Sequence, residues 1–276
     1  MATKDYTTIT ASDGTVLRHP DRPQPRYSAM RAWKNFRLLM KDKEDTSLVF
    51  KIYESLPSSD FMPRVEKLAL SERGEMLRAS EPYLPEILDD HAALRQTPKG
   101  SLAHAYCDFM ENEGLTAAGL VAESESLGRT KYSDVVQWFS ERSRDTHDLF
   151  HVLTGYGRDA LGEQCVLLFT HGQSPTHGHL LIGYAGSLNI KMGMRASKAP
   201  VMGAVNQAKR TGRGAPTLLE QPIRELLKQP LDKVRAALNI PEPTLYRECH
   251  RVWREEGIDP YDLLASENTT EKALAA

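Results

Sequence analysis

The chain has 276 residues, and its 35 lysines and arginines nearly balance its 37 aspartates and glutamates, for a formal charge of −2. This balance does not fit a strongly basic nucleic-acid binder or an acidic tail protein. Hydrophobic residues make up 40% of the chain and charged residues 26%, the composition of a globular protein with a sizeable core. The three cysteines form no CxxC pair, which excludes a disulfide framework and a cysteine zinc finger and indicates a reducing compartment.

Helical spacing of apolar residues predominates along the chain, and alternating strand patterns are scarce. We therefore expect an all-α protein built as a single-domain multi-helix bundle. Residues 1–26 are predicted to be an extended N-terminal arm, residues 27–240 the helical domain, and residues 241–276 a C-terminal helix and tail. Helices are predicted, in chain order, over residues 27–41, 48–56, 82–93, 101–113, 133–154, 159–168, 218–227, 231–238 and 244–256. The polar, glycine-rich stretch from Leu168 to Gly214 is predicted to be irregular.

Two histidines four residues apart, His147 and His151, are the strongest chemical signal in the sequence. Residues four apart lie on one face of a helix, so both imidazoles can point at one position. Asp148 can reach the edge of the same site. The Gly155-Tyr156-Gly157 break lets the chain reverse, so that Glu163 on the following helix can face the histidines. Two imidazoles and two carboxylates suit Zn²⁺, Fe²⁺ or Mn²⁺.

Other interpretations of this segment remain open. A histidine pair at helical spacing also arises by chance on solvated surfaces. A zinc peptidase of the HExxH type is a weaker match, because Asp148 stands where the glutamate base is required and Glu163 comes too soon for the usual third ligand. Arg144 lies one turn before His147 and could hold the Asp148 carboxylate in place, although an ordinary surface ion pair is equally compatible with the spacing.

The segment HDLFHVLTGYGRDALGE, residues 147–163, resembles the signature of the ubiquinone (coenzyme Q) biosynthesis family known as Coq-four. Residues 100–110, which begin GSLA, resemble the family's segment ahead of this motif. Residues 229–235, QPLDKVR, resemble its closing stretch. The resemblance covers roughly residues 27–240.

The resemblance implies a helical protein in which His147, Asp148, His151 and Glu163 hold a divalent metal, zinc in the first place, beside an apolar cavity for a polyprenylated ring. It implies metal-dependent replacement of the C1 carboxylate of 4-hydroxy-3-polyprenylbenzoate by hydroxyl, and organisation of the other enzymes of the pathway. A non-catalytic lipid-binding scaffold of that complex is the alternative. The sequence has no flavin, haem or nicotinamide motif, so it does not identify the oxidant. The expected partners are a polyprenylated aromatic lipid, other ubiquinone biosynthesis enzymes and further copies of this chain.

Positive charge gathers in one part of the sequence. No aspartate or glutamate occurs between Glu163 and Glu220. The basic residues of that interval are Lys191, Arg195, Lys198, Lys209, Arg210 and Arg213. They predict contact with anionic lipid headgroups or with the substrate carboxylate, and a solvated loop is the alternative.

The predicted helix over residues 27–41 is amphipathic. Met30, Trp33 and Phe36 lie on one side, opposite basic residues, as in a helix that lies in a membrane interface. Docking of that side onto the protein's own core is the alternative. The first twenty residues show no signal or transit peptide and no apolar run is long enough to span a bilayer, so we expect a cytoplasmic protein peripheral to the inner face of the cell membrane.

Residues 231–256 have the outline of a helix-turn-helix, which supplies a nucleic-acid-binding alternative. Acidic residues match the basic residues of this segment in number, and no positive face is assured. Since phosphate neutralisation supplies most non-specific affinity for nucleic acid, we expect no nucleic-acid partner.

Overall fold

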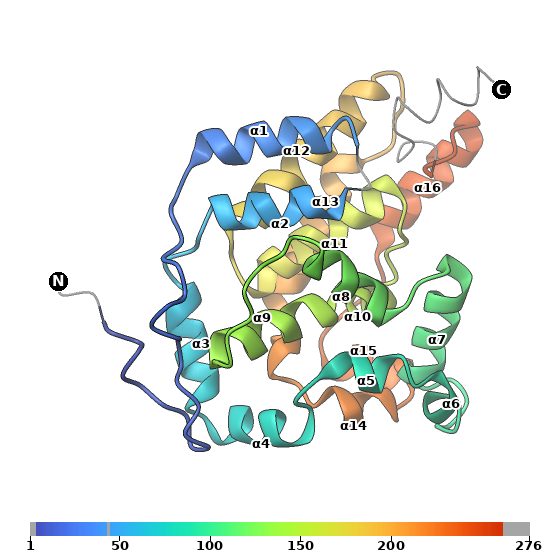
Figure 1. Ribbon diagram of the computed structural model, residues 1–276. Coiled ribbons are helices and arrows are strands. Elements are labelled where there is room, and N and C mark those ends of the chain that lie inside the picture. The colour runs from blue at the N-terminus through green and yellow to red at the C-terminus, as the bar shows by residue number, and fades with distance from the viewer. Residues whose placement is uncertain (1–3, 43–44, 262–276) are drawn as a thin grey trace. The chain divides into compact units, whose positions relative to one another are not determined.

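The structure, a computed structural model, describes residues 4–42 and 45–261 of the chain. Every regular element in these residues is a helix, and their β pairing is limited to two isolated bridges (Figure 1). The predicted all-α class is confirmed. The helices fall into two groups: group one has the described residues of Met1–Pro25, Ser58–Leu149 and Thr217–Val234, and group two has those of Arg26–Pro57, Phe150–Pro216 and Arg235–Ala276.

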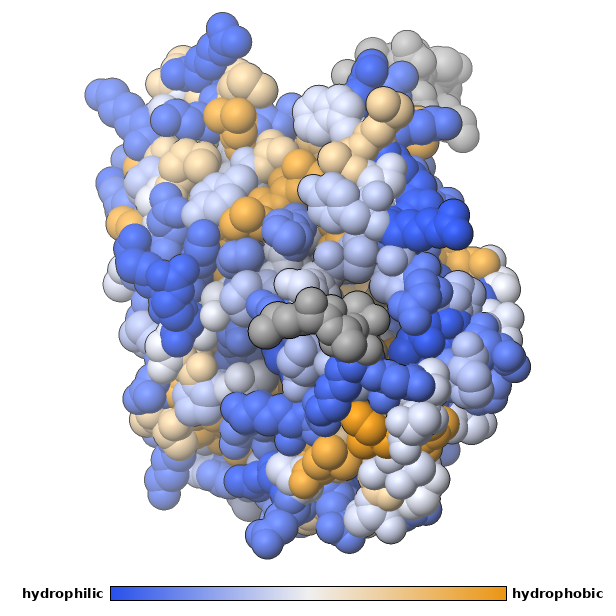
Figure 2. All heavy atoms as spheres, turned by 90° about the vertical axis from the view of Figure 1, so that its left-hand side faces the viewer, coloured by the Kyte–Doolittle hydropathy of each residue, from blue (hydrophilic) through white to orange (hydrophobic). Residues whose placement is uncertain are grey.

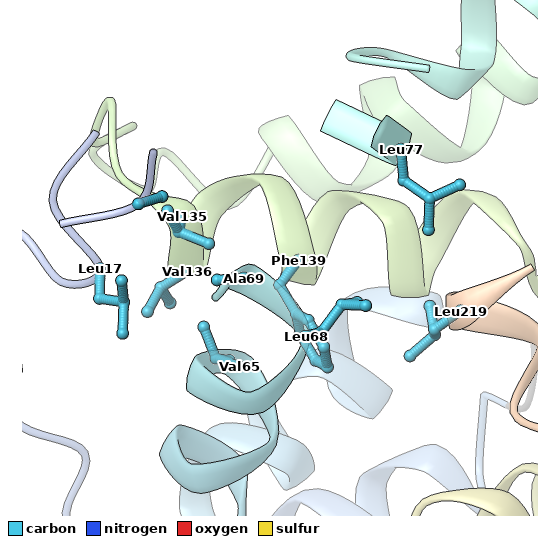
Figure 3. Close-up of a cluster of buried hydrophobic side chains, with 10 residues drawn as sticks. Leu17, Val65, Leu68, Ala69, Leu77, Val135, Val136, Phe139 and Leu219 are labelled. Atoms are coloured by element: carbon cyan, nitrogen blue, oxygen red, sulfur yellow. The ribbon is translucent and has the colours of Figure 1, made fainter. Parts of the chain in front are cut away.

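Group one consists mainly of short helices. They are α3 (Phe61–Ala69), α4 (Glu72–Ser80), α5 (Leu84–Leu88), α6 (His91–Leu94), α7 (Leu102–Glu113), α8 (Ala117–Glu125), α9 (Val135–Asp145), η1 (Leu218–Glu220) and α14 (Ile223–Leu227). Leucines and valines of α3, α4, α9 and η1 form a shared core, in which Val65 and Leu68 lie beside Phe139 (Figure 3). The rings of Phe61 and Phe139 meet edge to face in the same place, with centroids 5.6 Å apart.

The N-terminal segment is anchored to this core. It contains no helix in residues 4–25, but the side chain of Leu17 is fully buried. The N–H of Val135 donates to the carbonyl of Val16 at 3.0 Å. Arg22 donates two hydrogen bonds, of 2.6 and 2.8 Å, to Asp134, the N-cap of α9. The segment thus packs against the start of α9.

A buried ion pair joins several elements of group one. Arg142 on α9 donates to Glu81 at 2.9 Å, and both side chains are almost fully buried. The same guanidinium donates to the backbone carbonyls of Leu219 and Gln221. The second oxygen of Glu81 accepts from the N–H of Arg224 at 2.7 Å. These bonds satisfy both charges, as a buried pair requires.

Group two has longer helices and a separate core. Its helices are α1 (Ala29–Leu39), α2 (Thr46–Ser55), α11 (Ala160–Gln173), α12 (His177–Gly193), α13 (Val201–Gly214) and α16 (Thr244–Glu256). Phe36 of α1, Ile52 of α2, Leu167 of α11 and Ile182 of α12 are among the residues of this core. Two further helices, α10 (His147–Thr154) and α15 (Leu231–Ala237), contain residues of both groups.

The stretch that the sequence predicted to be irregular forms α12 and α13, so this prediction was wrong. Several of its glycines permit close packing between helices. A Cβ at Gly212 would lie 2.0 Å from the carbonyl oxygen of Phe169, and one at Gly172 would lie 2.5 Å from that of Lys209. Only glycine lets α11 and α13 approach to this distance without a clash. A glycine that opens a turn and one that permits packing look alike in a single sequence.

The other predicted helices differ from the observed ones mainly in where the chain interrupts them. The predictions over residues 27–41, 48–56, 101–113, 159–168 and 244–256 correspond to α1, α2, α7, α11 and α16. The predicted helix over 133–154 is divided into α9 and α10 at Thr146, whose hydroxyl donates to the carbonyl of Arg142 at 3.0 Å. Such bonds from threonine to the preceding turn bend helices. The helices α3, α4 and α8 were not predicted. In α3, Pro63 lies in the first turn, where a proline is tolerated because the backbone N–H groups there have no partner within the helix.

No helix of the described residues is both long enough and apolar enough to cross a bilayer. The apolar cavity that the resemblance implies stays a prediction.

We expect Gly212→Ala to lower the free energy of unfolding by about 1–3 kcal/mol, the usual cost of overpacking a close contact. The new Cβ would meet backbone atoms of α11, which cannot rotate away. Gly193→Ala is the matched control, because no atom lies within 4 Å of its Cβ position. Urea unfolding followed by circular dichroism measures the free energy of unfolding of both variants. An equal decrease in the two would contradict this account of the packing.

Candidate metal centre

The candidate metal ligands lie on α10 and on the first turn of α11. His147 and His151 are one turn apart on α10, which ends where Gly155 adopts a φ of +73°. Asp159 then begins α11, because its Oδ1 accepts hydrogen bonds from the N–H groups of Leu161 and Gly162 at 3.0 and 3.2 Å. Glu163 follows within that first turn.

The structure brings three of the predicted ligands together. Single ligand atoms of His147, His151 and Glu163 all lie within 4.8 Å of one another. The Nε2 of His151 is 3.5 Å from the Oε2 of Glu163. Tetrahedral zinc with ligands at about 2.1 Å separates its ligand atoms by about 3.4 Å. The spacing of these donors therefore suits a cation of that size.

The hydrogen bond of His151 prepares its ring for a cation. The ring is 1% exposed, and its Nδ1 lies 3.1 Å from the carbonyl oxygen of Tyr156. A carbonyl only accepts, so Nδ1 is the donor in this contact, and Nε2 is the ring nitrogen that can bind a metal. Metal-bound histidines commonly show this arrangement, with the second nitrogen donating to a carbonyl. Nε2 is also the atom that faces Glu163.

Glu163 stands between this histidine and an arginine. Its side chain is 26% exposed, and its Oε1 lies 3.7 Å from the Nε of Arg158. The other carboxylate oxygen faces His151. The arginine places a positive charge beside this carboxylate.

Asp148 and Arg144, the other two residues predicted for this site, are not part of the converging group. Asp148 is buried, but it is not part of the group whose ligand atoms converge, so its role as the fourth ligand stays a prediction. Arg144 donates to Asp145 at 2.6 Å, and its predicted contact with Asp148 also stays a prediction. Burial raises the pKa of Asp145 to about 6, with Glu141 and Asp148 acting in the same direction and Arg144 opposing them.

The six basic residues lie on or beside two helices instead of in a loop. Lys191 is on α12, Lys209, Arg210 and Arg213 are on α13, and Arg195 and Lys198 lie between these helices. Five of the six are exposed, whereas Lys209 is half-buried with its Nζ 5.1 Å from the centre of the Tyr184 ring. Their contact with lipid or substrate stays a prediction.

The proposed membrane face of α1 is divided. Met30 is 85% exposed and Trp33 is 54% exposed, but Phe36 is only 5% exposed. Phe36 packs in the core of group two beside Leu39 and Ile52. The predicted apolar side of α1 therefore divides in two: Met30 and Trp33 face outward, whereas Phe36 faces the core.

A second set of candidate ligands was not visible in the sequence. His91, Cys107 and Glu111 place ligand atoms within 4.8 Å of one another. Glu111 already accepts from Arg95 at 2.6 Å and lies 3.0 Å from the Nδ1 of His91. Arg95 thus engages the Glu111 carboxylate through a short hydrogen bond, whereas Arg158 lies 3.7 Å from Glu163, and we assign no metal to this set. No local spacing could have indicated it, since its members come from α6 and α7.

The helix-turn-helix outline is present as α15 followed by α16. Three of its four arginines are engaged within the chain: Arg235 donates to two backbone carbonyls of α10, and Arg247 and Arg251 form ion pairs with neighbouring glutamates. These contacts reduce the charge available to phosphates. The absence of a nucleic-acid partner stays a prediction.

Residues 60–244 match the family profile of the coenzyme Q (ubiquinone) biosynthesis protein Coq4. The chain belongs to the Coq4 family. Ubiquinone biosynthesis protein coq4 of Penicillium rubens is 23% identical, over 76% of this chain and 71% of that protein. The COQ4 homologue of Bos taurus is 24% identical over 65% of each chain. Both relatives are named as mitochondrial proteins.

The fold also has a counterpart among solved structures. A crystal structure from Nostoc punctiforme, of a protein assigned to ubiquinone biosynthesis, superposes with a TM-score of 0.58. It covers 78% of this chain and 100% of its own, at 18% identity. The likeness at this identity concerns the fold alone. The Coq4 family match includes α10 and α11 with all four candidate ligands, and it ends at the first residue of α16.

We expect His151→Ala and Glu163→Ala to lose the bound metal, because each removes one of three converging donors. His177→Ala is the control, since His177 lies outside this group on α12. Asp148→Ala tests whether Asp148 is the fourth ligand. If it binds the metal or holds a ligand in place, we expect the affinity for the metal to fall about tenfold or more. Elemental analysis of proteins purified under zinc supplementation measures the loss, and full occupancy of the Glu163→Ala variant would contradict the assignment.

Proposed function

We propose that this chain is a metal-dependent enzyme of ubiquinone biosynthesis that acts on the ring of a polyprenylated aromatic precursor. The Coq4 family takes part in ubiquinone biosynthesis, and this chain is a member. His147, Asp148, His151 and Glu163 would hold the divalent metal, zinc in the first place. The reaction class is replacement of the C1 carboxylate of 4-hydroxy-3-polyprenylbenzoate by hydroxyl, alongside organisation of the other enzymes of the pathway.

One observation carries this proposal. The Nδ1 of His151 donates to the carbonyl of Tyr156, and its Nε2 faces the Glu163 carboxylate at 3.5 Å, so this imidazole and this carboxylate form a donor pair whose geometry and chemistry suit a Lewis-acid metal. A metal bound there would supply a positive charge against which a ring carboxylate or phenolate is stabilised. Arg158 is 39% exposed beside Glu163, and it offers a second positive group to an anionic ring substituent. Loss of carbon dioxide with hydroxylation also requires an oxidising co-reactant, which this chain's own residues do not supply.

The alternative function is a non-catalytic lipid-binding scaffold for the enzymes of the same pathway. It needs the fold and its surfaces but not the metal ligands. The two functions therefore differ in what a metal-free variant can do.

We expect His151→Ala and Glu163→Ala to fail to restore ubiquinone in a strain that lacks its own Coq4-family protein. The precursor that still carries the ring carboxylate should accumulate, because the chain folds but lacks its metal. Mass spectrometry of the quinone and its precursors measures the outcome, with His177→Ala as the active control. Full restoration by a variant shown to be metal-free would contradict catalysis and support the scaffold.

We further propose that α1 brings the enzyme to a membrane, where a substrate with a long isoprenoid tail is confined. Met30 and Trp33 of α1 and Tyr27 just before it are exposed, and the exposed basic residues Lys34 and Arg37 lie on α1. Aromatic side chains with basic neighbours suit the headgroup region of an anionic bilayer. On the face drawn in Figure 2 the hydrophobic side chains of the described residues lie in separate groups bordered by hydrophilic ones, which suits shallow, peripheral contact.

We expect the double variant Met30→Glu/Trp33→Glu to lose flotation with vesicles of phosphatidylcholine and phosphatidylglycerol. Two carboxylates would then face the anionic surface in place of apolar groups. Met76→Glu is the control, because Met76 is also exposed but lies on α4. Binding of the double variant at the wild-type level would exclude α1 as the membrane contact.

A further inference from the structure

We propose that the C-terminal helix α16 positions the metal ligand Glu163 by holding the linker between α10 and α11, with Tyr246 and His250 as its positioning residues. The inference rests on the proposed function, since it concerns the same metal centre. It assigns a role to a helix that lies almost wholly beyond the Coq4 family match.

Tyr246 contacts the middle and the end of the linker. Its hydroxyl accepts a hydrogen bond from the N–H of Gly157 at 2.9 Å and donates one to the Oδ2 of Asp159. Its ring also meets Tyr156 edge to face, with centroids 5.2 Å apart. One buried side chain of α16 thus contacts three successive parts of the chain reversal.

Asp159 transmits this contact to the metal ligand. Its side chain is fully buried, and its two oxygens have separate tasks. Oδ1 caps α11 through the N–H groups of Leu161 and Gly162, whereas Oδ2 accepts from Tyr246 and lies 3.2 Å from the Nε2 of His250. Because Glu163 is four residues after this cap, the orientation of the cap sets where its carboxylate lies.

The linker is closely packed at two glycines. A Cβ at Gly157 would lie 2.9 Å from the Tyr246 hydroxyl and 3.2 Å from the Oδ2 of Asp159. A Cβ at Gly162 would lie 1.9 Å from the carbonyl oxygen of Gly157. These close approaches explain why glycine occupies both positions, and they fix the start of α11 against the linker.

The end of α10, which carries His151, is held in a similar way. Arg235 donates to the carbonyls of Leu153 and Val152, at 2.9 and 3.0 Å, and so caps the end of α10. His151 lies in this last turn of α10. The segment from Arg235 to His250 therefore contacts the ends of both ligand-bearing helices.

Tyr246→Phe tests the inference, because it removes one oxygen atom and keeps the ring. We expect the Kd of the full-length protein for Co²⁺, measured by visible absorption during titration, to rise about tenfold or more. The Co²⁺ bands themselves should shift, since the placement of Glu163 changes. Tyr184→Phe is the control: it also removes a tyrosine hydroxyl and its hydrogen bond, a part-buried one to Asn206 at 2.7 Å, but between α12 and α13.

His250→Gln provides a second variant, and urea unfolding verifies that each protein is folded at the temperature of the titration. Unchanged Co²⁺ affinity and spectrum in both Tyr246→Phe and His250→Gln would overturn the inference. An equal loss in Tyr184→Phe would also overturn it, since the effect would then be general loosening. Failure of the wild-type protein to bind Co²⁺ would contradict the proposed function itself, which keeps the two failures distinguishable.

Discussion

The chain reversal at Asp159 is the constraint on which the candidate centre depends. One oxygen of this buried carboxylate caps α11 and the other binds α16, so that both are engaged inside the protein. An N-cap carboxylate of this kind stabilises a helix by about 0.5–2 kcal/mol. Its consequence here is geometric: α11 starts at a defined point, and Glu163 faces His151. Glycine contacts bring α11 and α13 into close backbone contact.

The centre combines this rigidity with partial exposure. His151 is buried and its ring is oriented by the carbonyl of Tyr156, whereas Glu163 and Arg158 remain accessible. A site of this kind can hold a cation on the inner side and receive an anionic group on the outer side. Family membership supplies the pathway, and the donor geometry supplies the reason to expect metal chemistry within it.

The local features of this site could be predicted from the sequence, whereas the contacts between distant elements could not. The spacing of His147 and His151, the break at Gly155 and the cap at Asp159 are all set by residues close in the chain. Helices α7 and α16 were predictable for the same reason. The glycines of α12 and α13 looked like loop residues because their partners on α11 are far away in the sequence. Likewise, the amphipathic pattern of residues 27–41 left open whether Phe36 faces a membrane or the core, and nothing local indicated that Tyr246 reaches Asp159.

Anomalous diffraction at the zinc edge, from crystals of the full chain grown with Zn²⁺, tests the central claim most directly. The account predicts a peak about 2.0–2.2 Å from a ring nitrogen of His147, from the Nε2 of His151 and from a carboxylate oxygen of Glu163. A protein without a peak there, with zinc bound instead at His91, Cys107 and Glu111, would contradict it.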